Sequence, residues 1–452
     1  MRSEEGRRSL SLEPAQTAWI RRCKVPGAVL PGMIFGFLLV FFWTTAARGS
    51  VRFWTTAARG NVSASGPETA FAAAASGPGA ASWNPANLAL FPETRIEVFS
   101  LRAGLGNNSY SIGDYNELNG AFWDEAQKQE ILSQIETSRV TLEASGRLGA
   151  AGVSFEGLAF STETRVASVV AVPKEVLEIL LNGNTVGETF SLDGAEGAGI
   201  AFTEARISMA RPLSNLLPRV PAVVSGWTVG ASVKLLEGWF FGELLEASGG
   251  ITTTDELIYG EGKLCSMMAQ GGRGFGFDLG FAGPLGCDWT GSVAVRDLLA
   301  SITWTADAEE RIDVFEVPGI SLGSDGCDEV NTESATRPLD SVETNLPVIF
   351  SVGAAHHGDG VLTAIHFEVA TDSRYGASSN PLVSMGAAWQ LLSWLVVRGA
   401  ADLGGAVGTG LGGSVGVAIG PIQLDMGLQS RGTYNVFNSK GVTLATALSA
   451  SL

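Results

Sequence analysis

The sequence predicts an all-β fold, namely a transmembrane antiparallel β-barrel of about 14 strands with an N-terminal hatch and short extracellular helices. Three observations lead to this prediction. Apolar and non-apolar residues alternate along many short segments, these segments continue to the C-terminus, and glycine-rich turns separate them. The pattern predicts about sixteen strands, and a barrel of fourteen strands fits it equally well.

The composition supports a membrane barrel. Charged residues make up 17% of the 452 residues, 58 residues are glycine, and the mean hydropathy is +0.21. The chain is therefore apolar without the continuous apolar runs of a protein that crosses the membrane with several helices. Its net charge of -17 and the lack of a basic stripe argue against nucleic acid as a partner.

The N-terminal region predicts export. Basic residues within 21–24 precede an apolar stretch over 25–43, and small residues follow it. Residues 1–49 are therefore predicted to form a signal peptide with its basic n-region. A retained single anchor is the alternative. Together with the barrel pattern, a signal predicts the outer membrane of a Gram-negative-type bacterium, with outer-membrane lipid around the wall.

The next segment, 50–92, is predicted to be a hatch inside the barrel. Residues 61–90 are nearly all small residues and turn formers, too flexible for a wall strand and too apolar for a solvated linker. Many inward positions of the wall are Gly, Ala or Ser, which leaves room for such a segment. We expect Pro85 to stiffen the hatch and the amides to bond to the inner wall, which makes its candidate ligand-path residues Asn84, Pro85, Ala86 and Asn87.

Residues 93–452 carry the alternation expected of the barrel. Along 275–281 every odd position is large and apolar, whereas the even positions are Gly or Asp. The same pattern recurs over 227–235, 361–369, 422–428 and 441–452. Turn residues predict chain reversals near Gly271 and at 283–284, 358–360 and 420–421.

Three long connections, 106–140, 173–197 and 320–346, are predicted to lie mostly outside the cell. The first two contain amphipathic helix patterns. Such helices either cap or gate the lumen, or simply pack their apolar faces together, and the sequence leaves both roles open.

The cysteines do not suggest a disulfide framework. Of the four, Cys23 precedes the apolar stretch, which leaves an odd number in the exported chain. Cys265 and Cys287 are predicted to lie at opposite ends of the wall, beyond disulfide reach, because one strand separates the turns beside them. We therefore expect free thiols.

Candidate chemistry is sparse. His356 and His357 are neighbours on a strand and so face opposite sides. His366 and Glu368 share a face, but no third ligand stands at a fixed spacing, so a polar wall is preferred to a metal site. Without a nucleophile motif or a paired acid and base, the sequence predicts no enzyme, no catalytic residue and no cofactor.

Three short features suggest a family. The Ala-rich lead-in to Asn84-Pro85-Ala86 is similar to the hatch motif of outer-membrane barrels of the FadL and PorV type. The run 274–280 is similar to a mid-barrel motif of their uncharacterised branch, and Trp304 falls where that branch often has tryptophan. The resemblance covers residues 61–452. One departure is the last residue, Leu452, where many such barrels end in an aromatic.

The two branches of this family imply different functions. The transporter branch implies a hatch-filled barrel that takes up hydrophobic, fatty-acid-like molecules passively across the outer membrane. The PorV branch implies a non-transporting barrel that acts as scaffold or partner in a secretion or surface complex, with a protein partner that the sequence does not identify. A soluble periplasmic β-protein is a third class, and it alone would be extracted by salt without detergent.

Overall fold

The computed structural model describes residues 62–63, 69–119, 123–135, 137–183, 186–219, 221–286, 288–321 and 331–452. The predicted signal peptide lies outside the described residues, as does most of the first part of the predicted hatch segment. Among the residues that the structure describes, no helix is both long and apolar enough to cross a membrane.

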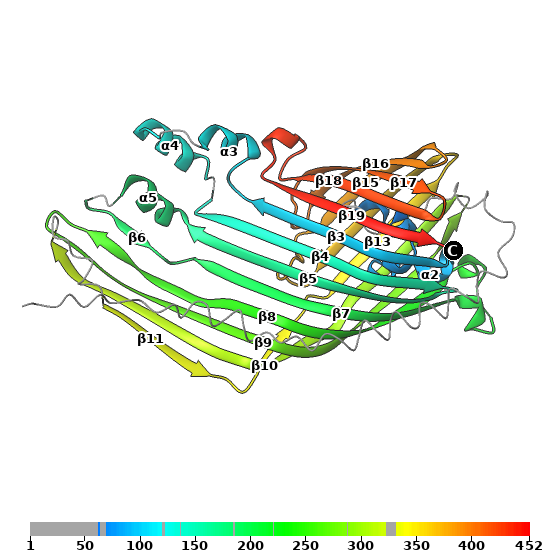
Figure 1. Ribbon diagram of the computed structural model, residues 1–452, viewed down its shortest axis with the longest axis horizontal. Helices are drawn as coiled ribbons and strands as arrows, with labels where there is room; N and C mark the ends of the chain where they lie inside the picture. Colours follow the sequence, from blue (N-terminus) through cyan, green and yellow to red (C-terminus); the bar gives the residue numbers. More distant parts are fainter. Residues whose placement is uncertain are drawn as a thin grey trace, which may run out of the picture. The chain divides into compact units, whose positions relative to one another are not determined.

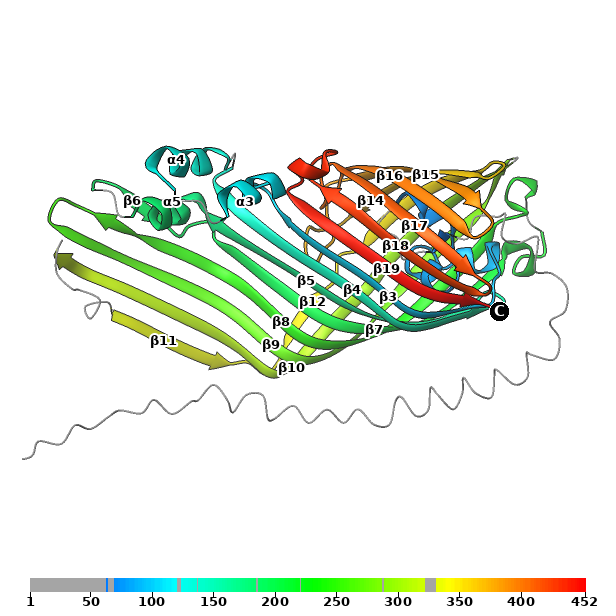
Figure 2. The same ribbon diagram turned by 45° about the horizontal axis from the view of Figure 1, so that its top comes forward.

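From Arg95 onward the described chain forms one closed β-barrel (Figure 1, Figure 2). Its strands are β3 (Arg95–Asn107), β4 (Arg139–Phe155), β5 (Leu158–Pro173), β6 (Thr189–Ser191), β7 (Glu196–Pro212), β8 (Thr228–Thr253), β9 (Leu257–Gly286), β10 (Trp289–Ser321), β11 (Asn331–Pro338), β12 (Val342–Asn345), β13 (Ile349–His357), β14 (Val361–Ala370), β15 (Leu382–Leu392), β16 (Leu395–Gly404), β17 (Gly410–Ile419), β18 (Ile422–Arg431) and β19 (Gly441–Ser451).

All neighbouring strands of the wall are antiparallel, and β19 pairs with β3 to close the sheet. Two wall strands are interrupted. β6 and β7 pair one after the other with β8, and β11, β12 and β13 pair one after the other with β10. Counted in this way over the described residues, the wall has 14 strands, which confirms the predicted fold class.

The outer face of the wall is apolar, as the alternation predicted. On β9, Phe275, Leu279 and Phe281 are 51%, 47% and 46% exposed, whereas Asp278 between them is 1% exposed. The closed sheet pairs backbone N–H and C=O groups within the wall, and along 275–281 the exposed side chains of this strand are apolar. This is the arrangement that lipid requires of a spanning structure.

The predicted turns are partly confirmed. β13 joins β14 through 358–360, and β17 joins β18 through 420–421. The predicted turn near Gly271 is wrong, because β9 continues through it, with Gly271 at a φ of +56° inside the strand. β9 also continues through 283–284 and ends at Gly286. Pairing with β8 and β10 on both sides holds this glycine-rich stretch extended, which overrides its local turn preference.

β8, β9 and β10 run beyond the other strands and form an extension of the wall (Figure 1). They are 26, 30 and 33 residues long. β6 and β11 pair with the extension, on β8 and on β10. The prediction that 320–346 is a loop is therefore wrong for β11 and β12. β11 is polar and wholly exposed, so it lacks the alternation by which the other strands were found.

Three helices, α3, α4 and α5, lie at the end of the barrel opposite to the C-terminus (Figure 1). α3 (Ile112–Leu118) and α4 (Glu125–Ser133) connect β3 to β4, and α5 (Lys174–Asn182) follows β5, in the two connections predicted to be helical. Leu132 and Ile135 form an apolar cluster with Leu177 and Leu181. α4 and α5 therefore pack their apolar residues together, in agreement with the second of the two predicted roles.

Replacing Leu279 with arginine tests the lipid-facing surface. We expect the change to lower the free energy of unfolding by about 2–4 kcal/mol, because a charge would enter the apolar band of the wall. Urea-dependent folding into lipid vesicles measures this cost. Leu257→Arg, at a 40% exposed position on the extension, is the control and should change stability by no more than about 0.5 kcal/mol. Equal costs at both positions would contradict a lipid-facing Leu279.

Candidate functional site: the occupied lumen

A segment rich in small residues crosses the lumen near the end of the barrel at which the C-terminus lies, and it is coloured blue in Figure 2. It consists of η1 (Thr69–Ala74), β2 (Ala75–Ser76), η2 (Pro78–Ser82) and α2 (Asn87–Leu90), and β2 pairs with β1 (Val62–Ser63). η1 contacts β13, β14 and β15, η2 contacts β3, β4 and β5, and α2 contacts β7, β8 and β9. Because these strands surround the lumen, residues 69–91, here called the hatch, span it from wall to wall.

Small residues on both sides make this fit possible. Ala70, Ala73 and Ala80 of the hatch are fully buried. The wall offers glycine where the hatch comes closest. A Cβ on Gly280 would lie 1.8 Å from Asn84 Oδ1, and a Cβ on Gly230 would lie 2.4 Å from the backbone nitrogen of Ala86. The absence of a side chain at these two wall positions is therefore required for the hatch to sit where it does.

Asn84 ties the hatch to the wall. Its side chain is 1% exposed, and Nδ2 donates to the carbonyl of Phe281 at 3.0 Å, to Ser292 Oγ at 3.0 Å and to the carbonyl of Val293 at 3.2 Å. Its Oδ1 accepts from the backbone N–H of Ala86 at 2.9 Å. One buried amide thus bonds to β9 and β10 and fixes the turn that follows it.

The other three predicted residues lie beside it. Pro85 and Ala86 pack against the backbone of β8, and the carbonyl of Ala86 accepts from Thr228 Oγ1 at 2.9 Å. Asn87 differs from the expectation that both amides bond to the wall. Its Nδ2 donates to the carbonyls of Ala72 and Ala75, at 2.9 and 3.2 Å, so it holds the hatch together.

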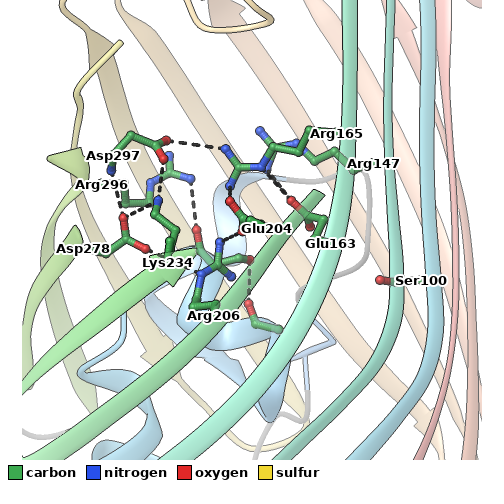
Figure 3. Close-up of polar contacts among 12 residues, drawn as sticks. Ser100, Arg147, Glu163, Arg165, Glu204, Arg206, Lys234, Asp278, Arg296 and Asp297 are labelled. Atoms are coloured by element: carbon green, nitrogen blue, oxygen red, sulfur yellow. Dashed lines mark hydrogen bonds and ion pairs between the residues drawn. The ribbon is translucent and has the colours of Figure 1, made fainter. Parts of the chain in front are cut away.

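A network of buried charges lines the inner wall beside the hatch (Figure 3). The carboxylates and cations come from consecutive strands β5, β7, β8, β9 and β10, and they are Glu163, Arg165, Glu204, Arg206, Lys234, Asp278 and Asp297. Lys234 Nζ lies 2.7 Å from Asp278 Oδ1 and also pairs with Asp297. Arg165 Nη2 lies 3.1 Å from Glu204 Oε2. Each of these charges has an opposite charge at contact distance, as burial requires.

A bulge in β10 brings two neighbouring side chains into the lumen together. Along a regular strand Arg296 and Asp297 would face opposite sides, yet they are 4% and 3% exposed. The register of β10 against β9 shifts between Val295 and Leu298, and Asp297 has a φ of +58°. An extra residue of this kind re-aims side chains. Here it delivers a cation and a carboxylate to the same face.

Arg296 connects the charge network to the hatch. Its Nη1 donates to the carbonyl of Ser82 at 3.1 Å, and its guanidinium lies 5.5 Å above the ring of Trp83. It also pairs with Glu368. His366 Nε2 lies 3.4 Å from the same carboxylate, so the predicted shared face of this pair is observed. Among the described residues, no group of three His, Cys, Asp or Glu side chains could hold a metal ion.

The charge network was not predicted from the sequence, because its carboxylates are far apart in the chain. A usable signal was present, however. Glu163 and Arg165 on one strand, and Glu204 and Arg206 on the next, repeat the same spacing of two on the inward face. With the register in hand, Glu163 is directly opposite Glu204. The network could therefore have been predicted from these two pairs if the register of the strands had been known.

An apolar cluster fills another part of the inner face. Trp304 is fully buried, stacks on Phe241 with ring centroids 5.8 Å apart, and donates from Nε1 to Thr344 Oγ1 at 3.1 Å. A Cβ on Gly238 or Gly272 would lie less than 3 Å from its ring. The wall is therefore shaped around this indole, which packs where its polar N–H still finds a partner.

A cavity of about 460 Å³ remains in the lumen. The hatch contributes Trp83 to its lining, the wall contributes Phe202 and Arg165, and the connection from β14 to β15 contributes Tyr375. Burial raises the pKa of Tyr375 to about 12, so its hydroxyl remains protonated at neutral pH. The cavity is thus lined by the hatch, by residues of the charge network and by apolar side chains.

The closed wall, its apolar outer face and the segment across its lumen define a plugged transmembrane β-barrel. Solved barrels similar to this chain include the toluene transporter TodX of P. putida, with 11% identity, a TM-score of 0.49, and coverage of 86% of this chain and 99% of that one. The toluene transporter TbuX of Ralstonia pickettii has 14% identity, a TM-score of 0.47, and coverage of 83% and 94%.

A FadL homologue of Pseudomonas aeruginosa is similar at 12% identity and a TM-score of 0.45, with coverage of 89% of this chain and 98% of that one. The solved structures that this chain is similar to therefore include a homologue of FadL, the type that its motifs resemble. In sequence, residues 89–266 match a family of unknown function, DUF5723, over less than half of the chain. No curated protein matches the sequence significantly.

Proposed function

We propose that the protein is an outer-membrane barrel that takes up hydrophobic, fatty-acid-like small molecules passively, with the hatch as a displaceable plug. The occupied lumen is the observation that carries this proposal. The wall leaves space at Gly230 and Gly280, and a separate segment fills it. A segment held by hydrogen bonds and small-residue packing can leave a lumen, whereas large side chains of the wall itself cannot.

The cavity beside the hatch supports a path for partly apolar molecules. Trp83, Phe202 and Leu346 contribute apolar surface to it. Its volume of about 460 Å³ lies within the usual range of small-molecule sites. Trp83 belongs to the hatch and lies beneath Arg296, so movement of the hatch would open the cavity toward the C-terminal end of the barrel.

A second candidate is a non-transporting barrel that scaffolds a secretion or surface complex. The extension of β8, β9 and β10 favours it, because a long protruding sheet edged by β6 and β11 is more than a pore requires. The proposal of uptake is nevertheless preferred, since a scaffold has no use for a cavity beside a removable segment.

Uptake by lipid vesicles distinguishes the two. Vesicles that contain the purified chain should accumulate a labelled fatty acid faster than protein-free vesicles and should exclude a hydrophilic dye. A variant without residues 69–90 should admit the dye, because its lumen is unblocked. Uptake equal to that of empty vesicles, together with a protein that copurifies in stoichiometric amount, would overturn the proposal in favour of the scaffold.

A further inference from the structure

β11 forms an open edge of the extension. It pairs with β10 over its whole length of eight residues, and no other described strand is paired with it residue by residue. Every residue of β11 is exposed, and Figure 2 shows the strand at the margin of the sheet. β6, which pairs with the extension on β8, has only three residues. An exposed edge as long as β11 is a template on which a further strand can pair.

The backbone groups of β11 that point away from β10 can be assigned. Leu339, directly after β11, donates its N–H to the carbonyl of Ala308 at 2.8 Å, and this pair continues the register of β11 on β10. In an antiparallel pair, only alternate residues bond to a given neighbour. Pro338 therefore faces away from β10, where its missing N–H costs no bond. The residues that turn both N–H and C=O to the open side are Thr332, Ser334 and Thr336.

β11 lacks the usual features that prevent edge strands from pairing. Proteins protect such edges with bulges, prolines and charged side chains, especially lysine. The pairing of β11 with β10 has no bulge. Proline occurs only at the end of the strand, and over 331–336 the single charged residue is Glu333. The edge is therefore regular along the residues whose backbone groups are open.

The surroundings of the edge are acidic. β11 and the stretch of β10 that pairs with it, 309–316, contain five acidic residues and two arginines, which gives a formal charge of -3. Both arginines are already paired. Arg337 pairs with Glu310. Arg311 lies 3.0 Å from Asp313. The three acidic residues that form no ion pair within the described part of the chain are Glu309, Glu316 and Glu333.

Three acidic side chains share one face of the sheet beside the edge. Glu261 of β9 is directly opposite Glu316 of β10. Glu333 of β11 is directly opposite Val314, two residues before Glu316, and therefore lies on the same face. Like charges at such positions repel one another. Positive side chains on the matching face of an added strand would remove this repulsion.

We propose that β11 binds an extended, basic segment of another protein, which adds a strand to the open edge. Backbone hydrogen bonds to the three open residues hold the segment, and lysine or arginine at alternate positions faces Glu316 and Glu333. A second copy of this chain fits less well, because its own β11 would bring the same acidic residues. This binding surface goes beyond the proposed uptake of hydrophobic molecules and does not depend on it.

Fluorescence anisotropy with the detergent-solubilised full chain tests the edge. The probe is a labelled peptide of eight residues in which threonine and lysine alternate. We expect saturable binding, which Ser334→Pro should weaken by about tenfold or more, because proline removes the central open N–H. Ser334→Ala is the matched control. It loses the same side-chain hydrogen bond to Asp313, 2.6 Å long, but keeps the N–H, so it should bind as the unchanged protein does.

The acidic face is tested by removing its charge. The double variant Glu316→Gln and Glu333→Gln should weaken binding of the probe by about threefold at low ionic strength, because two exposed pairings with lysine are lost. At high ionic strength the difference should disappear, since salt screens exposed charges. A double variant that binds the probe as the unchanged protein does at low ionic strength would contradict a basic partner.

Two further peptides separate strand pairing from attraction between charges. One is N-methylated at every threonine and the other at every lysine, and both keep the full charge. Only alternate N–H groups of an added strand bond to β11, so one of the two peptides should bind and the other should not. If both bind equally well, charge alone attracts the peptide and the proposal is overturned.

The variants also decide which partner uses the edge. Ser334→Pro should leave the strand in place, because the N–H of Ser334 makes no bond to β10, and heat-dependent gel migration checks that the barrel is folded. The proposal is overturned if the folded variant binds the probe as the unchanged protein does. Self-association of the chain that Ser334→Pro abolishes would overturn the choice of partner in favour of a second copy.

Discussion

Replacing Lys234 with methionine should lower the free energy of unfolding by about 3–5 kcal/mol, because it removes one partner from a buried ion network. Lys234 is fully buried, and its ammonium group contacts Asp278 and Asp297. Methionine has similar length but leaves these two carboxylates without the cation between them. Urea-dependent folding into lipid vesicles measures the loss.

The control for this prediction is the same substitution at an exposed ion pair. Lys263 and Glu246 lie 2.6 Å apart on the extension, and their side chains are 42% and 48% exposed. Solvent screens such a pair, so Lys263→Met should lower the free energy of unfolding far less than Lys234→Met does. Adding Asp297→Asn to Lys234→Met should restore part of the stability, since it removes the charge of a carboxylate that has lost its lysine partner. If the two single variants cost the same, the network does not stabilise the wall.

Replacing Gly230 with alanine should open the lumen. The new Cβ would lie 2.4 Å from the backbone nitrogen of Ala86 and 2.4 Å from the carbonyl carbon of Pro85. Neither backbone atom can rotate away as a side chain would, so the hatch itself must shift. An overpacking cost of about 3 kcal/mol corresponds to a roughly 100-fold change in the equilibrium between seated and displaced hatch. We expect the open fraction in single-channel recordings to rise accordingly.

Gly413→Ala is the matched control for Gly230→Ala. A Cβ on Gly413 would have its nearest neighbour, the carbonyl oxygen of Arg398, at 3.7 Å, which is an ordinary contact. Its recordings should therefore resemble those of the unchanged protein. If a folded Gly230→Ala variant has the same open fraction as the unchanged protein, the hatch is not what keeps the lumen closed.

Much of the barrel could be predicted from the sequence, because lipid on one side and lumen on the other impose a period of two. The strands around 361–369 and 422–428 were found in this way. The prediction failed where pairing overrides local preference, as at Gly271 in β9. It also failed for β11, whose eight residues are all exposed, so that no alternation of apolar and polar residues marks the strand.

The candidate site was less accessible from sequence. Asn84 could be singled out because an amide among small residues needs buried partners. Three arginines that line the cavity, Arg102, Arg147 and Arg165, could not be predicted as neighbours, because only the register of β3, β4 and β5 brings them together. The side chains of Arg296 and Asp297 both face the lumen because of a bulge, and the alternation of residues in the sequence does not reveal a bulge. To predict such features one must know which residues of neighbouring strands are paired, and the periodicity of each strand does not give this.

Accessibility of spin labels along β9 in lipid vesicles tests the membrane barrel most directly. Single cysteines would carry nitroxide labels at Phe275, Leu279 and Phe281, and at Tyr259 on the extension, in a chain whose natural cysteines are replaced by serine. If the wall faces lipid, the first three labels should collide with oxygen dissolved in the bilayer and not with a water-soluble nickel complex, while the label at Tyr259 should show the reverse. Labels at all four positions that meet the nickel complex equally would contradict a lipid-facing wall.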